Sequence, residues 1–151
     1  MSPQLSTATI VKVDILAAVA RVRLEEARVL HRAGKYAGAV YLAGYAVECE
    51  LKVAICRTLG WSELRRTFMT HDLESLLLHS GFDGELRKDV EMSKTFANIS
   101  AIWRLEGRDN VRYVTPATFA EGDARRFLAW VTGPKKGFVP WLRRKVSKKH
   151  N

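Results

Sequence analysis

The segment from residue 34 to residue 52 constrains the fold more than any other part of the sequence. It is almost entirely apolar, and glycine and alanine recur along it. Four polar or aromatic residues in it are spaced by four, three and four: Tyr41, Tyr45, Glu48 and Lys52. This spacing places them on one stripe of an α-helix. A helix that is apolar on most faces belongs in a core, so we expect the stripe to form a satisfied network or to line a site.

Helical periodicity continues through the rest of the chain, whereas hairpin turns between alternating apolar runs are absent. We expect five helices, over about residues 10–33, 36–59, 70–81, 83–107 and 115–131. The expected boundaries are marked by glycines that end helices and by polar residues that begin them. Because the connections are short, the sequence predicts an all-α fold, an antiparallel up-and-down bundle of four to five helices.

The net charge of +9 is unevenly distributed. Seven of the 25 basic residues lie between Lys135 and Lys149, where there is no acid. We therefore expect one helical domain over residues 1–134 and a basic C-terminal tail over residues 135–151, with at most one amphipathic turn around Trp141 and Val146. Such a tail is either a solvated, poorly ordered end of the chain or a segment that contacts nucleic acid or an acidic partner.

Composition also limits the cellular context and the chemistry. The longest uncharged run, from Tyr36 to Val47, is too short to cross a bilayer, and we expect no secretory signal. Cys49 and Cys56 lie two turns apart on one expected helix, too far to bond, so we interpret them as core residues in a reducing cytoplasm. The four histidines are scattered without a ligand spacing, so we expect no metal and no cofactor.

Two parts of the sequence are candidates for a binding site. Glu48 and Lys52 are spaced i, i+4 with the acid first, which is the favourable order for an ion pair. They either form a buried ion pair that ties helices together, or Glu48 positions a basic residue from the loop around Arg112. His71, at the start of the third expected helix, is either an imidazole packed at a helix end or part of that site.

The second candidate is a basic segment with an aromatic residue at its end: Arg104, Arg108, Arg112 and Tyr113. Arginine binds phosphate through two hydrogen bonds, and tyrosine can stack on a base. The alternative is an arginine paired with Glu106 or Asp109 on a surface loop. The sequence leaves both interpretations open.

Three of these patterns together resemble the HEPN-domain family. Residues 34–39 (GKYAGA) followed by 45–52 (YAVECELK) resemble its second-helix signature. Residues 71–73 (HDL) match its usual opening of the third helix, and Trp103 followed by Arg112 and Tyr113 resembles a "W…RY" segment of one branch. The similarity covers about residues 12–131.

The resemblance implies a four- to five-helix up-and-down bundle that often forms a dimer. Many members of the family are ribonucleases of toxin–antitoxin or defence systems and often pair with a minimal nucleotidyltransferase. Others have lost catalysis and bind nucleotides, RNA or protein. The ribonucleases typically carry an arginine and a histidine separated by four to six residues, near the start of the last core helix.

This sequence departs from that catalytic pattern, because no histidine follows in the segment from Arg108 to Tyr113. The candidates at that place are Arg112, whose pKa is too high for proton exchange near neutrality, and Tyr113, which is a poor base at pH 7. Whether the protein is an enzyme therefore stays open, and binding is favoured.

The favoured hypothesis is a HEPN-type protein that binds RNA or nucleotide as a homodimer. Its expected ligand-binding residues are Tyr45, Glu48, Lys52, His71, Arg108, Arg112 and Tyr113. The alternatives are an active metal-independent ribonuclease toxin and a structural partner subunit for a minimal nucleotidyltransferase.

Overall fold

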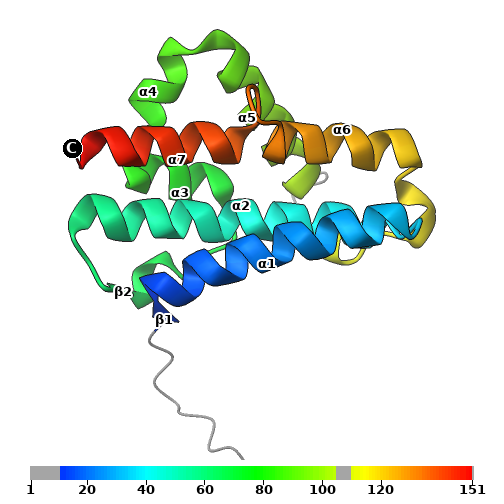
Figure 1. The fold of residues 1–151 in the computed structure, drawn as a ribbon, viewed down its shortest axis with the longest axis horizontal. Helices are drawn as coiled ribbons and strands as arrows, with labels where there is room; N and C mark the ends of the chain where they lie inside the picture. Colours follow the sequence, from blue (N-terminus) through cyan, green and yellow to red (C-terminus); the bar gives the residue numbers. More distant parts are fainter. Residues whose placement is uncertain (1–10, 105–109, 151) are drawn as a thin grey trace, which may run out of the picture.

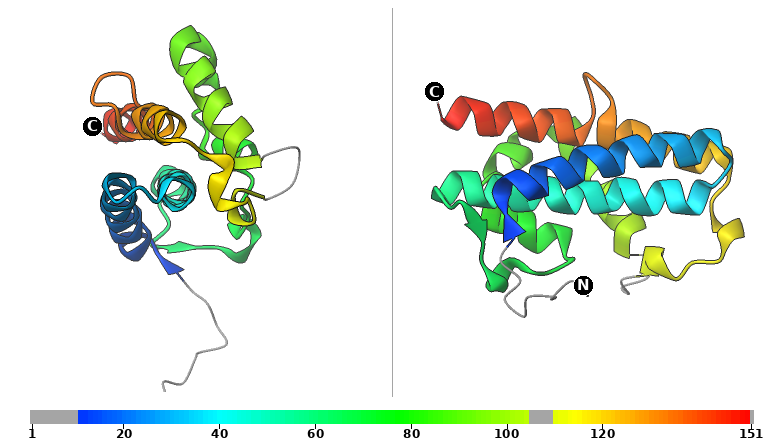
Figure 2. Two further views of the ribbon diagram at one scale, coloured as in Figure 1. Left: turned by 90° about the vertical axis from the view of Figure 1, so that its right-hand side faces the viewer. Right: turned by 60° about the horizontal axis from the view of Figure 1, so that its bottom comes forward.

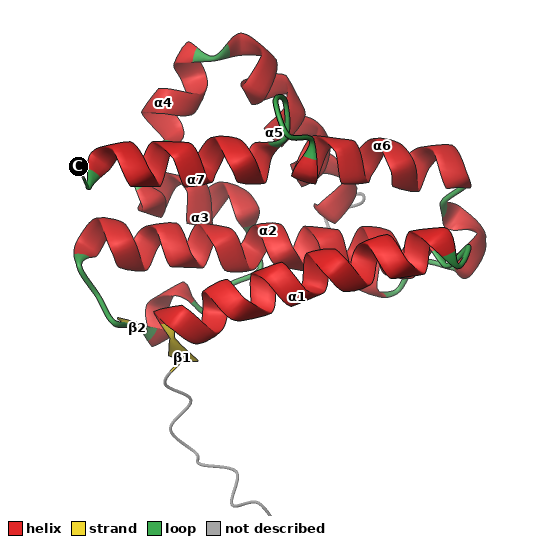
Figure 3. Ribbon diagram, in the orientation of Figure 1, coloured by secondary structure: helices red, strands yellow, loops and turns green. Residues whose placement is uncertain are grey.

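The computed structural model describes residues 11–104 and 110–150, and helices make up most of them (Figures 1 and 3). The all-α class is thereby confirmed. The described residues form seven α-helices, more than the four or five expected: α1 (Val13–Arg32), α2 (Tyr36–Leu59), α3 (Leu73–Ser80), α4 (Asp83–Lys88), α5 (Val90–Arg104), α6 (Glu121–Thr132) and α7 (Phe138–Lys149). Short 3-10 turns are η1 (Arg66–Phe68), η2 (Asn110–Arg112) and η3 (Pro116–Thr118).

Helices α1 and α2 form a long antiparallel hairpin (Figure 1). The turn between them needs Gly34, whose φ of 75° lies in the left-handed region that glycine adopts without strain. α2 begins and ends where the sequence predicted, at Tyr36 and Leu59, and Gly60 stops it in the same left-handed conformation. The hairpin thus follows directly from local sequence signals.

α2 is the central helix of the molecule. It packs against α1, α3, α6 and α7, and the end-on view in Figure 2 shows it surrounded by them. Its small residues allow these close approaches. At Gly44 the indole ring of Trp103 lies so near that a Cβ would come within 2.6 Å of Trp103 Cζ3. The glycine therefore makes room for an aromatic ring from α5.

Three boundaries differ from the predictions for local reasons. Asp72, not Thr70, caps α3, because its Oδ1 accepts hydrogen bonds from the backbone N–H groups of Glu74 and Ser75. The fourth expected helix is divided at Asp89 into α4 and α5. Pro116 begins only the 3-10 turn η3, and α6 starts later, at Glu121.

A small strand pair, which the sequence did not indicate, closes the N-terminal end of the described chain. β1 (Val11–Lys12) pairs antiparallel with β2 (Glu63–Leu64), with Val11 opposite Leu64. The pair fastens the start of α1 to the connection that follows α2. Two-residue strands carry no periodicity that could reveal them in the sequence.

The prediction of a basic tail is wrong for residues 138–149, which form α7 and complete the core. Phe138, Val139, Trp141, Leu142 and Val146 are buried in the main hydrophobic cluster. α6 and α7 run nearly in line along α2 (Figure 1) and are joined by a turn in which the Gly137 N–H donates to the Gly133 carbonyl at 2.8 Å. Alanine at Gly133 would place a Cβ 2.7 Å from the Ala129 carbonyl oxygen, so the turn requires glycine there.

None of the helices in residues 11–104 and 110–150 combines the length and the apolar composition that crossing a bilayer requires.

Candidate functional site

The polar stripe of α2 contains a buried ion pair. Lys52 Nζ donates to Glu48 Oε1 at 2.7 Å, and the two side chains are 6% and 1% exposed. The ion-pair interpretation of the i, i+4 spacing is confirmed. Two charges this deep in a core are tolerated only when they are paired and hydrogen-bonded.

The second carboxylate oxygen of Glu48 forms a hydrogen bond with His71. Glu48 Oε2 lies 2.8 Å from His71 Nδ1, while the imidazole is 41% exposed. Glu48 thus uses both oxygens, one for the buried lysine and one for a histidine that reaches the surface. Among the described residues no hydrogen bond or ion pair joins Arg112 to Glu48. Arg108, another basic residue of that loop, lies outside the described residues, so the alternative in which Glu48 positions a basic residue of the loop stays a prediction for Arg108.

Two further interactions fix the backbone around His71. The Trp103 indole N–H donates to the His71 carbonyl oxygen at 2.8 Å, which ties α5 to the start of α3. Next to it, Arg104 Nη2 lies 3.1 Å from Asp72 Oδ1 and 3.2 Å from Glu74 Oε2. Burial works to raise the pKa of Asp72, but hydrogen bonds from Arg104 and from the Ser75 backbone outweigh it and lower that pKa.

The aromatic members of the stripe lie beside this network. The Tyr41 ring stacks on Trp103 with centroids 6.1 Å apart and on Tyr45 at 6.4 Å. Burial, with the nearby Cys49 thiol, raises the pKa of Tyr45. Burial, with the charge of Glu48, raises the pKa of Cys49 to about 11. Both groups therefore stay neutral near pH 7, and Tyr41 and Tyr45 form a packed wall of the network.

The Arg112–Tyr113 segment makes no hydrogen bond or ion pair with the described residues of the Glu48 network. Arg112 ends the turn η2, which contacts α2 and α5, and it is half-buried without a hydrogen bond or ion pair to any described residue. Tyr113 is 80% exposed. Arg104 is paired with acids of α3, and Arg108 lies outside the described residues. The structure thus brings together Tyr45, Glu48, Lys52 and His71, and leaves Arg112 and Tyr113 available to solvent.

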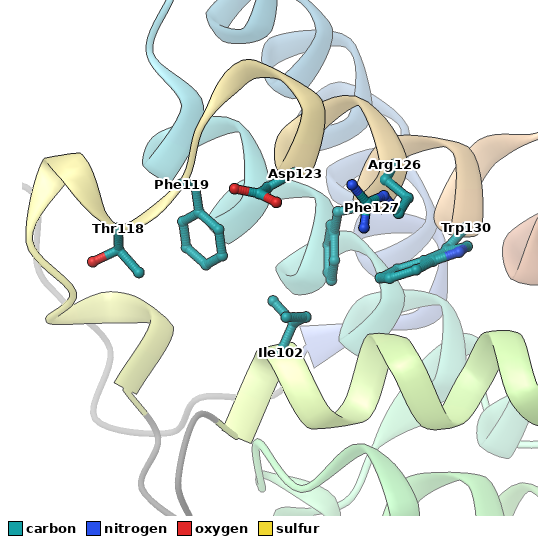
Figure 4. Close-up of a pocket in the computed structure, with 7 residues that line it drawn as sticks. All are labelled: Ile102, Thr118, Phe119, Asp123, Arg126, Phe127 and Trp130. Atoms are coloured by element: carbon teal, nitrogen blue, oxygen red, sulfur yellow. The ribbon is translucent and has the colours of Figure 1, made fainter.

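A pocket of about 240 Å³ lies between α5 and α6, near the turn η3 that follows Tyr113 in the chain (Figure 4). Figure 4 shows the rings of Phe119, Phe127 and Trp130 gathered around Ile102, with Asp123 and Arg126 at the edge. The sequence patterns did not indicate this pocket. Its lining combines Ile102 of α5 with aromatic residues in and just before α6, so no spacing within one helix could have revealed it.

The chemistry available at His71 follows from its geometry. When Nδ1 carries the proton and donates a hydrogen bond to Glu48, Nε2 has a free lone pair, and no described residue donates a hydrogen bond to it. A carboxylate that orients an imidazole in this way is the arrangement used for general-base catalysis. In the described chain, no group of three or more His, Cys, Asp or Glu side chains is placed to hold a metal ion.

Sequence reasoning also missed a group of charged residues on the opposite side of α2. Glu50 is buried, with a side chain 7% exposed, and it accepts hydrogen bonds from Arg143 of α7, with Nε at 3.1 Å. Its partner lies 93 residues away in the chain, and Arg143 had been placed in the tail. Only the docking of α7 brings the two together.

Comparison of the chain with protein-family models, with curated proteins and with solved structures finds no match.

Proposed function

We propose that this protein is a HEPN-type helical bundle that binds RNA or nucleotide, acts within a toxin–antitoxin or defence-type system, and forms a homodimer. The observation that carries the proposal is the Glu48–Lys52–His71 network, in which a buried ion pair underlies a half-exposed imidazole. These three residues belong to two of the three sequence patterns that resemble the family. The proposal gives the buried charges a role, since a core helix gains little stability from an ion pair alone.

In the proposed site, His71 offers a donor or acceptor at the surface, Arg112 binds phosphate and Tyr113 stacks on a base. The half-buried position of Arg112 without a described acidic partner supports this role, because its guanidinium is not neutralised. The 80% exposure of Tyr113 supports stacking, because a core tyrosine would not present its ring to a ligand.

Fluorescence anisotropy with a short single-stranded RNA and with labelled ATP tests this proposal. We expect Arg112→Ala to weaken the binding of either ligand by about tenfold or more, because the variant loses a charge-assisted hydrogen bond to phosphate. Arg87→Ala is the matched control, since Arg87 is an exposed arginine on α4, with its side chain 80% exposed. Unchanged affinity in a folded Arg112→Ala variant would refute the proposal.

A second function, metal-independent ribonuclease activity, is favoured by one observation, the 2.8 Å contact between Glu48 and His71. His71 Nε2 would remove the proton of a 2′-hydroxyl, and Arg112 would stabilise the developing charge on phosphate. RNA cleavage in the presence of EDTA that is lost in His71→Asn, and growth arrest on expression that the same change relieves, would establish it. A wild-type protein that leaves both RNA and growth unaffected would exclude it.

The dimer is tested separately, by light scattering at tens of micromolar protein, where a monomer would contradict it. Pairing with a minimal nucleotidyltransferase stays a prediction of the resemblance, tested by co-purification with such an enzyme encoded beside this protein's gene.

A further inference from the structure

A groove of about 310 Å³ runs between α1 and α7, with α2 as its floor. In Figure 1, α1 and α7 lie on either side of the C-terminal half of α2. The floor is formed by Glu50 and Val53, and the walls carry Arg21 from α1 and Arg143 and Ser147 from α7, with Arg57 at the end of α2. Arginines from three different helices therefore face one depression.

The groove has an excess of positive charge. Its single acid, Glu50, is occupied by Arg143, so these two charges cancel. Arg21 and Arg57 have no carboxylate within ion-pair distance among the described residues. The remaining charge is that of two arginines in a concave site, where low-dielectric walls strengthen the field felt by an anion.

Folding alone does not explain this arrangement. Arg143 is enough to satisfy the buried Glu50, and both Arg21 and Arg57 are exposed, so neither is needed to cover the core. Two uncompensated like charges in one groove repel each other, which disfavours the folded state. The planar fork of arginine matches the oxygen atoms of phosphate and binds them through two hydrogen bonds. The Ser147 hydroxyl adds a donor at the wall.

The positive charge continues past this groove along α7. On the other side of that helix a second groove, of about 370 Å³, is lined by Lys145, Lys148 and Lys149. Lys145 lies 3.5 Å from Glu85, but Lys148 has no described acidic partner. Cations on both sides of one helix fit a chain of phosphates better than a single phosphate ion.

We propose that the groove formed by Arg21, Arg57, Arg143 and Ser147 binds the phosphodiester backbone of RNA, with α7 as the helix along which the strand lies. This inference rests on the proposed function and extends it, because it places the backbone of the ligand on the opposite side of α2 from Glu48. The two arginines that are not paired, Arg21 and Arg57, are the groups that contact phosphate.

The test is the binding of a short fluorescein-labelled oligouridylate, measured by anisotropy over a series of NaCl concentrations. We expect the double variant Arg21→Gln/Arg57→Gln to lose affinity by about tenfold or more, and the slope of log K against log[salt] to flatten by about 1.4, since each phosphate neutralised on a single strand contributes about 0.7. The matched control is Arg28→Gln/Arg32→Gln, which removes the same charge from exposed positions of α1 outside the groove. We expect it to keep the wild-type slope.

Three outcomes would overturn the inference. The first is a folded groove variant with wild-type affinity and slope, and the second is an equal loss in the control. The third is a groove variant that loses pyrophosphate binding, measured by calorimetry, but keeps RNA binding, which would assign the site to free phosphates. Arg112→Ala in the same assay separates the two proposals: a loss there, with none in the groove variant, removes the groove and leaves the proposed function standing.

Discussion

α2 carries two buried carboxylates only two residues apart, and the molecule neutralises them in different ways. Glu48 and Glu50 are 1% and 6% exposed and point to nearly opposite sides of the helix, as i and i+2 positions do. Glu48 pairs with Lys52 from its own helix, and Glu50 pairs with Arg143 from α7.

The two pairs differ in where the positive charge lies. Lys52 is buried like Glu48, so the first pair forms a network that, among the described residues, reaches the surface at His71. Arg143 is 46% exposed and lies at the edge of a groove with two more arginines. A carboxylate paired inside the core organises the bundle, whereas one paired at the surface fastens a helix and leaves a charged surface open to a ligand. Substitutions on either side of α2 test this difference.

The largest effect is expected for Glu48→Gln. The change leaves Lys52 buried without a counter-charge, and breaking a buried pair in this way costs about 3–5 kcal/mol of the free energy of unfolding. Urea denaturation followed by circular dichroism measures it. The double variant Glu48→Gln/Lys52→Met removes both charges and should recover most of the loss. A loss below about 1 kcal/mol in the single variant would show that the network is not closed to water.

Gly44→Ala should destabilise the same side of α2 without touching any charge. The added Cβ would overlap the ring of Trp103, which holds the His71 carbonyl, and overpacking of this kind costs about 1–3 kcal/mol. Urea denaturation gives the cost. Tryptophan fluorescence should also change in the native state, and Gly84→Ala, where a Cβ meets nothing within 4 Å, is the control for the glycine-to-alanine change. Equal effects of the two changes would contradict the close approach of Trp103.

Arg143→Gln should cost less than Glu48→Gln, about 1–2 kcal/mol. It removes charged hydrogen bonds to Glu50, but the half-exposed site lets water and salt compensate in part. We expect the cost to shrink in high salt, whereas the cost of Glu48→Gln should not, because buried pairs are screened much less. Denaturation curves at low and high NaCl measure both, and the same salt dependence for the two variants would remove the distinction between the pairs.

The smallest effect concerns Asp72, at the surface beside the Glu48 network. Its pKa is lowered, against the effect of burial, by Arg104 and by backbone donors, so its ionised form stabilises the folded state. That contribution is complete above the unfolded pKa of about 3.9 and disappears as the pH falls through the lower folded value. Because the side chain is 45% exposed, we expect under about 1 kcal/mol.

Carboxyl NMR titration of wild type and Arg104→Gln measures this directly. The pKa of Asp72 should rise in the variant, and the difference in stability between the two proteins should vanish in acid. A pKa of Asp72 that does not move would show that the backbone donors alone account for the shift.

The sequence was sufficient where partners are close along the chain and insufficient where they are not. The i, i+4 spacing predicted the Glu48–Lys52 pair, and glycines marked both ends of the α1–α2 hairpin. The Glu48–His71 contact joins residues 23 apart, and the Glu50–Arg143 contact joins residues 93 apart. A pattern within one helix cannot predict a contact between residues so far apart in the sequence.

The error about α7 has the same physical origin. Gly133 and Pro134 are correct signals that a helix ends, but a stop signal does not say where the chain goes next. Apolar residues at helical spacing form the buried face of α7: Phe138, Trp141, Leu142 and Val146. Basic residues on its outer face lie between them in the sequence, so the high charge of the segment obscures this spacing. A basic helix and a basic tail can have the same composition, but the helix buries one face against the rest of the protein.

The docking of α7 on α2 has a consequence for the order of events during synthesis. A ribosome releases the α1–α2 hairpin before α7, and N-terminal parts of a chain begin to fold before the rest has emerged. Until the residues up to Val146 have followed, Glu50 has no counter-charge and the side of α2 that α7 covers faces water. The nascent chain therefore passes through a stage in which its longest helix, which is largely apolar, is only partly covered, and a chaperone that binds exposed apolar helices would recognise it at that stage.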